Sequence, residues 1–207
     1  MMLFTHYPKE TAIIVILTAG GGLAFYAYTT YMQKFLINSA MGPLGEGFSK
    51  EQASQIMTTC LVIFMLVQPL AGAISDKIGR KITLAASFGL GAVIAYPVLT
   101  AIAASTSVGQ AMLLCMLPLI VLSGYTSMSA IVKAELFPAH VRALGVAVPY
   151  SVAQAVFGGN AETVALKLKD MGNESAFFWI LAGVLGLGCV TALLMRDTKK
   201  HSLITEE

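Results

Sequence analysis

The sequence predicts an all-α integral membrane protein with six transmembrane helices. Of its 207 residues, 57% are hydrophobic and 12% are charged, whereas soluble domains carry about 25% charged residues. So few charges cannot cover a surface that faces water, and lipid is therefore expected to solvate most of the chain. The net charge of +2 gives no indication of a nucleic-acid partner, and none is expected.

The uncharged runs between consecutive charged residues set the number of helices. A spanning helix needs about 20 apolar residues, because the hydrocarbon core of a bilayer is about 30 Å thick. Four runs have the length of one span, and residues 82–132 are long enough for two, with the turn-forming sequence ASTSVGQ at 104–110 between them. The expected bundle covers 11–195, between an N-terminal segment (1–10) and a tail (196–207), and its spans are 11–33, 52–74, 82–103, 110–132, 143–166 and 176–195.

The distribution of basic residues predicts the orientation. With six spans, both termini lie on the same side as loops 75–81 and 133–142. That side holds nine of the thirteen Lys and Arg residues and the other side holds four, so the positive-inside rule makes both termini cytoplasmic. The first span is expected to be retained, because its uncharged run of 23 residues exceeds the about 7–15 residues of a signal peptide's apolar region.

The spans contain helix-perturbing residues that a simple anchor does not need. The second to fifth spans hold one proline each, and every such proline removes a backbone hydrogen bond and favours a kink. Glycines cluster, for example at 20–22, and small residues let membrane helices pack closely. A tightly packed bundle and a bundle whose kinked helices move both fit this pattern. The prolines are Pro69, Pro97, Pro118 and Pro149.

Polar side chains inside the spans mark a cavity or interhelical hydrogen bonds, because unpaired polar groups are costly there. For Tyr31 and Gln33 an interfacial aromatic belt is an equal alternative. Glu162 is the one acidic residue within an expected span. It is a candidate for proton coupling, and the alternatives are a solvated residue at the mouth or an ion-pair partner of Lys167. The expected substrate pathway consists of Tyr26, Tyr28, Gln68, Tyr125, Gln154 and Asn160.

Two loops on the expected cytoplasmic side resemble paired motifs of one family. GAISDKIGRK at 72–81 resembles the G-x-x-x-D-x-x-G-R-[KR] loop of the major facilitator superfamily, and AELFPAHVRALG at 134–145 resembles its companion E-x-F-P-x-x-x-R-x-x-G. In that family the loops follow the second and fourth helices of a six-helix half, as they do here. FYAYTTYMQKFL at 25–36 and FGGNAETVALKLK at 157–169 are similar to the metabolite:proton symporter branch, and within it to the bacterial alpha-ketoglutarate permeases.

The resemblance implies a fold and an activity. The family has twelve helices in two pseudo-symmetric halves that hold the substrate between them, so this chain is expected to be a six-transmembrane-helix half of a major-facilitator fold, in the bacterial inner membrane. The implied function is proton-coupled symport of alpha-ketoglutarate or a related dicarboxylate, with an N-terminal half or a second copy as partner. The family's motif residues form a salt-bridge network, which implies a cytoplasmic gate made of Asp76, Arg80, Glu135 and Arg142.

Other functions stay open at this point. A dicarboxylate needs compensating positive charge in a low-dielectric cavity, yet the spans contain no Arg or His, and Lys34, Lys133 and Lys167 lie at their ends. The cationic clamp is therefore expected in another half. Shikimate, citrate, proline or betaine are alternative cargoes, and a transport-inactive truncated membrane protein is the competing class. The sequence has no Cys/His metal spacing, Ser/His/Asp set or phosphate loop, so no enzyme activity, metal or cofactor is expected.

Overall fold

The computed structural model describes residues 6–196, and every regular element in this part of the chain is a helix. Six helical segments are long and apolar enough to cross a membrane, which confirms the predicted fold class. Three of these segments are not continuous α-helices: the first and the fifth contain a π-helical segment, and the fourth has a short break between Thr126 and Ser129. The elements are α2 (Pro8–Tyr26), η1 (Ala27–Tyr31), α3 (Met32–Asn38), α4 (Lys50–Ile78), α5 (Arg80–Ala103), α6 (Val108–Thr126), α7 (Ser129–Glu135), α8 (Ala139–Ala153), η2 (Gln154–Gly158), α9 (Ala161–Asp170) and α10 (Glu174–Leu194).

The helices begin and end at residues with clear local causes. Ser49 starts α4 with a capping box, in which its side chain accepts a hydrogen bond from the Gln52 backbone and the Gln52 side chain accepts one from the Ser49 backbone. Gly79 is the single residue between α4 and α5, and its φ of 107° is one that only glycine adopts without strain. Pro138 has an extended backbone and precedes α8, so it separates the fourth helix from the fifth.

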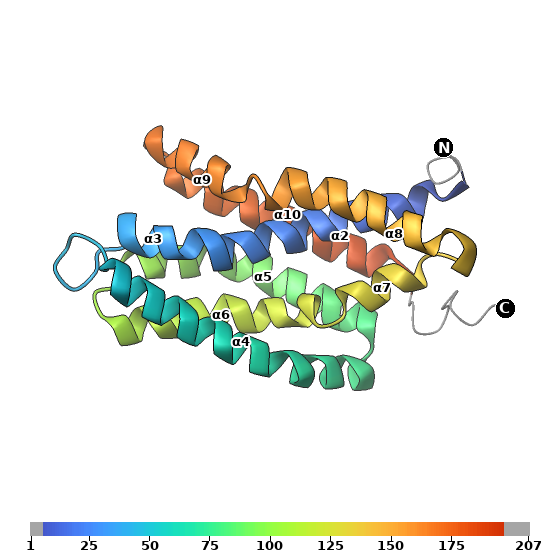
Figure 1. The fold of residues 1–207 in the computed structure, drawn as a ribbon, viewed down its shortest axis with the longest axis horizontal. Helices are drawn as coiled ribbons and strands as arrows, with labels where there is room; N and C mark the ends of the chain where they lie inside the picture. Colours follow the sequence, from blue (N-terminus) through green and yellow to red (C-terminus); the bar gives the residue numbers. More distant parts are fainter. Residues whose placement is uncertain (1–5, 197–207) are drawn as a thin grey trace.

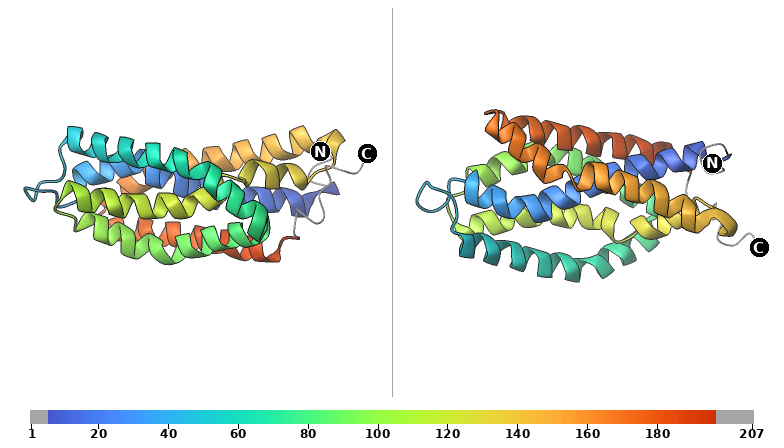
Figure 2. Two further views of the ribbon diagram at one scale, coloured as in Figure 1. Left: turned by 90° about the horizontal axis from the view of Figure 1, so that it is seen from below. Right: turned by 45° about the horizontal axis from the view of Figure 1, so that its top comes forward.

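The helices pack side by side along one long axis (Figure 1). Helix α2 is the most buried of the six and packs against α10 on one side and against α8 and η2 on the other. Helix α5 packs against α10 and α6, and α4 packs against α6. Helices α4 and α8 consequently lie at opposite edges of the bundle, as the views in Figures 1 and 2 show.

The two ends of the bundle differ in their connections. We call the end that holds the α4–α5 and α7–α8 junctions (residues 76–80 and 135–142) the motif end. The opposite end, which holds residues 38–50 and 170–174, is called the loop end; Figure 1 shows the two ends on the right and the left. The loop after α3 is tied to the end of α5, because the backbone amide of Met41 donates to the carbonyl of Ala103 at 2.8 Å.

The first and fifth helices each contain a π-helical segment, which the sequence pattern does not predict. Segment η1 continues α2, and η2 packs against α2. Glycines make this approach possible. A Cβ atom on Gly22 would lie 2.5 Å from Oε1 of Gln154, and one on Gly158 would lie 2.9 Å from the ring of Tyr26. Single π-helical turns are frequent at functional sites. Segment η2 contributes Gln154 to the cavity described next, and η1 begins directly after Tyr26, which also lines it.

Candidate functional site

A cavity of about 300 Å³ lies between the first, fourth and fifth helices. Its volume is at the lower end of the range for small-molecule pockets, and its walls combine aromatic rings with hydroxyl and amide groups. We call it the tyrosine cavity. Its lining residues are Gly21, Gly22, Phe25 and Tyr26 from α2, Tyr125 and Thr126 from α6, Ser129 from α7, Tyr150 from α8 and Gln154 from η2.

Glycine in α2 makes room for the tyrosine that forms one wall. A Cβ atom on Gly21 would lie 2.0 Å from Cε1 of Tyr125, which is far too close for two non-bonded carbon atoms. On its other side the ring of Tyr125 packs against Phe88, with 5.1 Å between the ring centroids. The position of Tyr125 is therefore set by the absence of a side chain at residue 21 and by an aromatic neighbour on α5.

The structure brings three of the six expected pathway residues together in this cavity: Tyr26, Tyr125 and Gln154. Gln68 does not line the cavity itself but contacts a residue that does: its Oε1 accepts a 2.9 Å hydrogen bond from the hydroxyl of Thr126. This bond ties α4 to α6 beside the cavity.

The other two expected pathway residues lie elsewhere. Tyr28 is buried against Phe88 and Pro118, because residues two apart on a helix do not share a face and Tyr26 takes the cavity side. Asn160 is exposed and donates hydrogen bonds to the carbonyls of Ala155 and Val156, at 3.3 and 3.0 Å. The amide of Asn160 thus satisfies backbone groups of the η2 segment.

Lys133 corrects the expectation that no cation lies among the spans. Its side chain is only 3% exposed, because the fourth helix continues through α7 to Glu135. Its Nζ donates a 3.1 Å hydrogen bond to the hydroxyl of Tyr125 and lies 4.4 Å from the ring centroid of Tyr150. Both tyrosines line the cavity, so a buried ammonium group stands directly behind two of its walls.

Sequence reasoning missed Lys133, Tyr150, Ser129 and Thr126 as parts of this site. The sequence spacing could have revealed two of these residues, Ser129 and Lys133. Tyr125, Ser129 and Lys133 follow one another at intervals of four residues, which places them on one face of a helix. Ending the span at the first charged residue hid this spacing.

At the motif end, the structure joins two of the four expected gate residues. Arg80, in the first turn of α5, forms an ion pair with Glu135, in the last turn of α7. Arg142 donates from Nε to the carbonyl of Phe137 at 3.1 Å and so braces the turn before α8. Asp76 is exposed in the last turn of α4.

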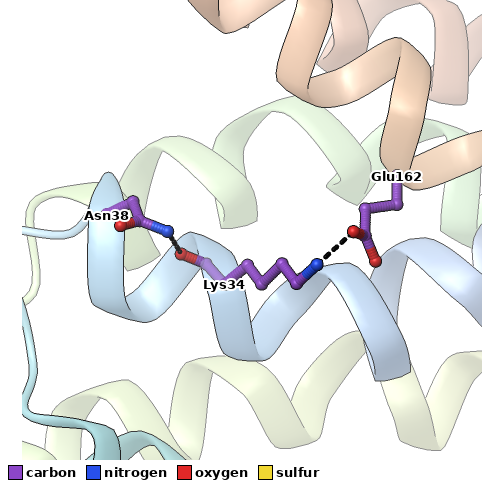
Figure 3. Close-up of polar contacts among 3 residues, drawn as sticks. All are labelled: Lys34, Asn38 and Glu162. Atoms are coloured by element: carbon purple, nitrogen blue, oxygen red, sulfur yellow. Dashed lines mark hydrogen bonds and ion pairs between the residues drawn. The ribbon is translucent and has the colours of Figure 1, made fainter.

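At the loop end, Glu162 forms an ion pair with Lys34, which overturns the alternative that paired it with Lys167. Figure 3 shows the two side chains pointing toward one another from α9 and α3. Nearby, Nζ of Lys169 donates to the hydroxyl of Ser39 at 2.8 Å, and that hydroxyl donates to Glu174 at 2.6 Å. These bonds connect the first, fifth and sixth helices.

Tyr31 belongs to this loop-end network and not to an exposed aromatic belt. Its ring is 1% exposed and its hydroxyl donates to Glu174 at 2.8 Å. The other residue for which a belt was considered, Gln33, lines an open polar pocket of about 660 Å³ beside α4. The remaining residues of this pocket are Lys50, Glu51, Ser54, Gln55, Thr58 and Thr59.

Comparison with known proteins identifies the family. The sequence profile of the Major Facilitator Superfamily matches residues 23–207. The chain is 47% identical to the alpha-ketoglutarate permease of Escherichia coli K12 over 196 residues, which are 94% of this chain and 44% of the permease. It is 28% identical to the citrate-proton symporter of Klebsiella pneumoniae over 182 residues, 84% of this chain and 38% of that protein.

A third relative transports a different kind of solute. The glycine betaine/proline/ectoine/pipecolic acid transporter OusA of Dickeya dadantii is 26% identical over 206 residues, 96% of this chain and 38% of the transporter. The chain spans less than half the length of each of these three relatives. The profile match, the six membrane-length helices and the two loop motifs agree, and the chain belongs to the Major Facilitator Superfamily.

Proposed function

We propose that this chain is one six-helix half of a proton-coupled symporter for alpha-ketoglutarate or a related dicarboxylate in the bacterial inner membrane. The observation that carries the proposal is the 47% identity to the alpha-ketoglutarate permease across 94% of the chain. A relative named citrate-proton symporter supports both the carboxylate cargo and the proton coupling.

The structure supplies groups suited to this task. The tyrosine cavity offers phenol, hydroxyl and amide hydrogen-bond donors, which orient a carboxylate ligand. Its partner in the membrane is a second six-helix unit, which we propose is an N-terminal half of the kind present in the longer relatives, with a second copy of this chain as the alternative. Both termini are cytoplasmic in this proposal, because the motif end then carries the excess of Lys and Arg.

Two sites outside the cavity complete the proposed cycle. We assign Asp76, Arg80, Glu135 and Arg142 to a cytoplasmic gate, supported by the ion pair between Arg80 and Glu135. We assign proton binding to Glu162, whose carboxylate is partly exposed and pairs with Lys34. Protonation would remove the negative charge of Glu162 and with it the attraction to Lys34.

Uptake of radiolabelled alpha-ketoglutarate tests the proposal. Escherichia coli cells that lack their own alpha-ketoglutarate permease would express this chain, the N-terminal portion of that permease, or both. We expect accumulation only with both, and its loss when a protonophore collapses the proton gradient. Accumulation by this chain alone would favour the second-copy arrangement. Assembly of the two parts in the membrane without any uptake would refute the proposed function.

Competition in the same assay addresses the cargo. The similarity to a transporter of betaine, proline and ectoine makes a zwitterion the second candidate. Excess unlabelled citrate or shikimate, and excess proline or betaine, are each added to the labelled substrate. A dicarboxylate symporter is expected to be inhibited by carboxylates and unaffected by proline and betaine.

A further inference from the structure

Lys133 is a buried cation without an acidic partner in the described part of the chain. Among residues 6–196, no carboxylate forms an ion pair with it. The nearest acid along its own helix, Glu135, pairs with Arg80 instead. Removing an ammonium group from water is costly unless an opposite charge compensates it, so this arrangement is incomplete as it stands.

Two aromatic rings offset part of this cost. Nζ of Lys133 lies 4.4 Å from the ring centroid of Tyr150 and 5.3 Å from that of Tyr125, distances at which a cation is attracted to the face of a ring. Ring contacts stabilise the charge without neutralising it. The positive potential of Lys133 therefore extends through these side chains into the tyrosine cavity that they line.

The hydroxyl of Tyr125 links the ammonium group of Lys133 to the cavity, because the bond from Nζ polarises it. Because it accepts a bond from Nζ of Lys133, its own proton is left for donation, and a ligand in the cavity would compete for that proton with the nearby hydroxyls of Ser129 and Thr18. A phenol polarised by an ammonium group is a stronger donor than an ordinary one, and hydrogen bonds involving charged groups are roughly twice as strong as neutral ones. Such a pair suits a carboxylate oxygen.

We propose that Lys133 and Tyr125 form an anion subsite inside the tyrosine cavity that receives the second carboxylate of the substrate, the C5 carboxylate of alpha-ketoglutarate. The identity of that carboxylate as part of a dicarboxylate rests on the proposed function. Lys133 then determines specificity: it favours a dianion over a ligand whose second carboxylate is absent, and it disfavours a ligand that presents an ammonium group to this wall.

The competing explanation is a structural lysine that only packs between two rings. The two explanations differ in their dependence on ligand charge. Loss of a packing residue weakens all ligands alike, whereas loss of a carboxylate's counter-charge weakens the dianion selectively. Alpha-ketoglutarate and its 5-amide, which has nearly the same shape and one negative charge fewer, separate these cases.

The test compares Lys133→Met, which removes the charge, with Lys133→Arg, which keeps it, in this chain assembled with the N-terminal portion of the Escherichia coli permease. The KM for labelled alpha-ketoglutarate is measured, together with the inhibition constant of the 5-amide. We expect Lys133→Met to raise the KM by about tenfold or more, as for loss of a charged hydrogen bond, and to change the 5-amide constant far less. Lys133→Arg should keep most of the preference for the dianion.

Two matched variants complete the set. Tyr125→Phe removes the hydroxyl and keeps the ring, and should raise the KM for the dianion without loss of expression. Lys77→Met removes an exposed lysine at the motif end and should leave both constants unchanged. If Lys133→Met raises both constants equally or leaves the KM unchanged, the subsite is refuted while the wild-type uptake still supports the proposed function.

A second measurement keeps the subsite testable if the assembled protein does not transport. Binding of labelled alpha-ketoglutarate is then measured on the purified 207-residue chain in nanodiscs of phosphatidylethanolamine and phosphatidylglycerol. Binding that is lost in Lys133→Met and kept in Lys133→Arg supports the subsite and refutes the symporter. Absence of binding by the wild-type chain, with no transport, refutes both.

Discussion

Arg80 and Glu135 form an ion pair that joins the first turn of α5 to the last turn of α7, and both side chains are largely buried, at 15% and 6% exposure. A salt bridge exposed in a loop would contribute about 0–1 kcal/mol. Burial changes this expectation. The second oxygen of Glu135 is buried and has no hydrogen-bond partner in the described part of the chain, so the charge of this carboxylate is compensated mainly by Arg80.

Removing one member of this pair should therefore cost more than removing both. Arg80→Met leaves an uncompensated buried carboxylate, and we expect a loss of about 3–5 kcal/mol of stability. The double variant Arg80→Met/Glu135→Met should recover most of it, because apolar residues replace a desolvated pair. Thermal unfolding of the purified chain in detergent, followed by the fluorescence of its single tryptophan, Trp179, measures the effect. Additive losses in the double variant would show that the pair does not couple α5 to α7.

The space beside Gly21 should be essential for the tyrosine cavity. Gly21→Ala forces the ring of Tyr125 to move, and overpacking of this kind typically costs about 1–3 kcal/mol. We expect a lower unfolding temperature and weaker substrate binding. Gly183→Ala is the matched control, since Gly183 lies in α10 and an added Cβ atom would meet nothing within 4 Å, so this variant should be neutral. Equal behaviour of the two variants would contradict the described packing of Tyr125 against α2.

Variants of Glu162 and Lys34 distinguish a role of Glu162 in proton coupling from a role in ion pairing alone. Glu162→Gln cannot bind a proton, so the assembled protein should lose accumulation driven by a pH gradient and keep the exchange of labelled for unlabelled substrate. Lys34→Met breaks the same ion pair and keeps the carboxylate, so coupling should persist. The pair is partly exposed, at 50% and 28%, and its loss should change stability by less than about 1 kcal/mol. Normal accumulation in Glu162→Gln would exclude this residue as the coupling site.

The orientation can be determined by cysteine labelling from each side of the membrane. The background is a chain in which Cys60, Cys115 and Cys189 are replaced by alanine. Lys77→Cys probes the motif end, and Leu44→Cys probes the loop end, where Leu44 is 89% exposed. A membrane-impermeant maleimide added outside intact cells should react with the cysteine at residue 44 and reach residue 77 only after the membrane is opened. The reverse pattern would place the termini outside.

The number of helices and the two loop motifs were predictable from the sequence, because lipid allows charges only near the ends of spans and at paired sites. The same rule ended the first and fourth helices too early. The first helix continues past Lys34 to Asn38, and the half-exposed side chain of Lys34 pairs with Glu162 of the fifth helix. The fourth continues past Lys133 because two tyrosine rings surround the ammonium group. Glu162 and Tyr150 are distant in sequence from the lysines that they contact, so a run of uncharged residues could not reveal them.

Part of the cavity was predictable for a similar reason. Tyr26, Tyr125 and Gln154 stood out as polar groups in apolar segments, and they meet in the structure. The different position of Tyr28 follows from helix geometry, because residues two apart do not share a face. The role of Asn160 depends on η2, whose carbonyls at Ala155 and Val156 accept its hydrogen bonds, and the pattern of uncharged runs does not reveal a π-helical segment.

The central claim is that this chain supplies one half of a proton-coupled dicarboxylate symporter, and the most direct test is the movement of protons with the substrate. Lightly buffered, right-side-out vesicles that contain the chain and the N-terminal portion of the permease receive alpha-ketoglutarate, while the external pH is recorded. We predict an alkaline shift that requires both parts and is abolished by a protonophore. No shift in vesicles where both parts are assembled, or the same shift in vesicles without this chain, would contradict the account.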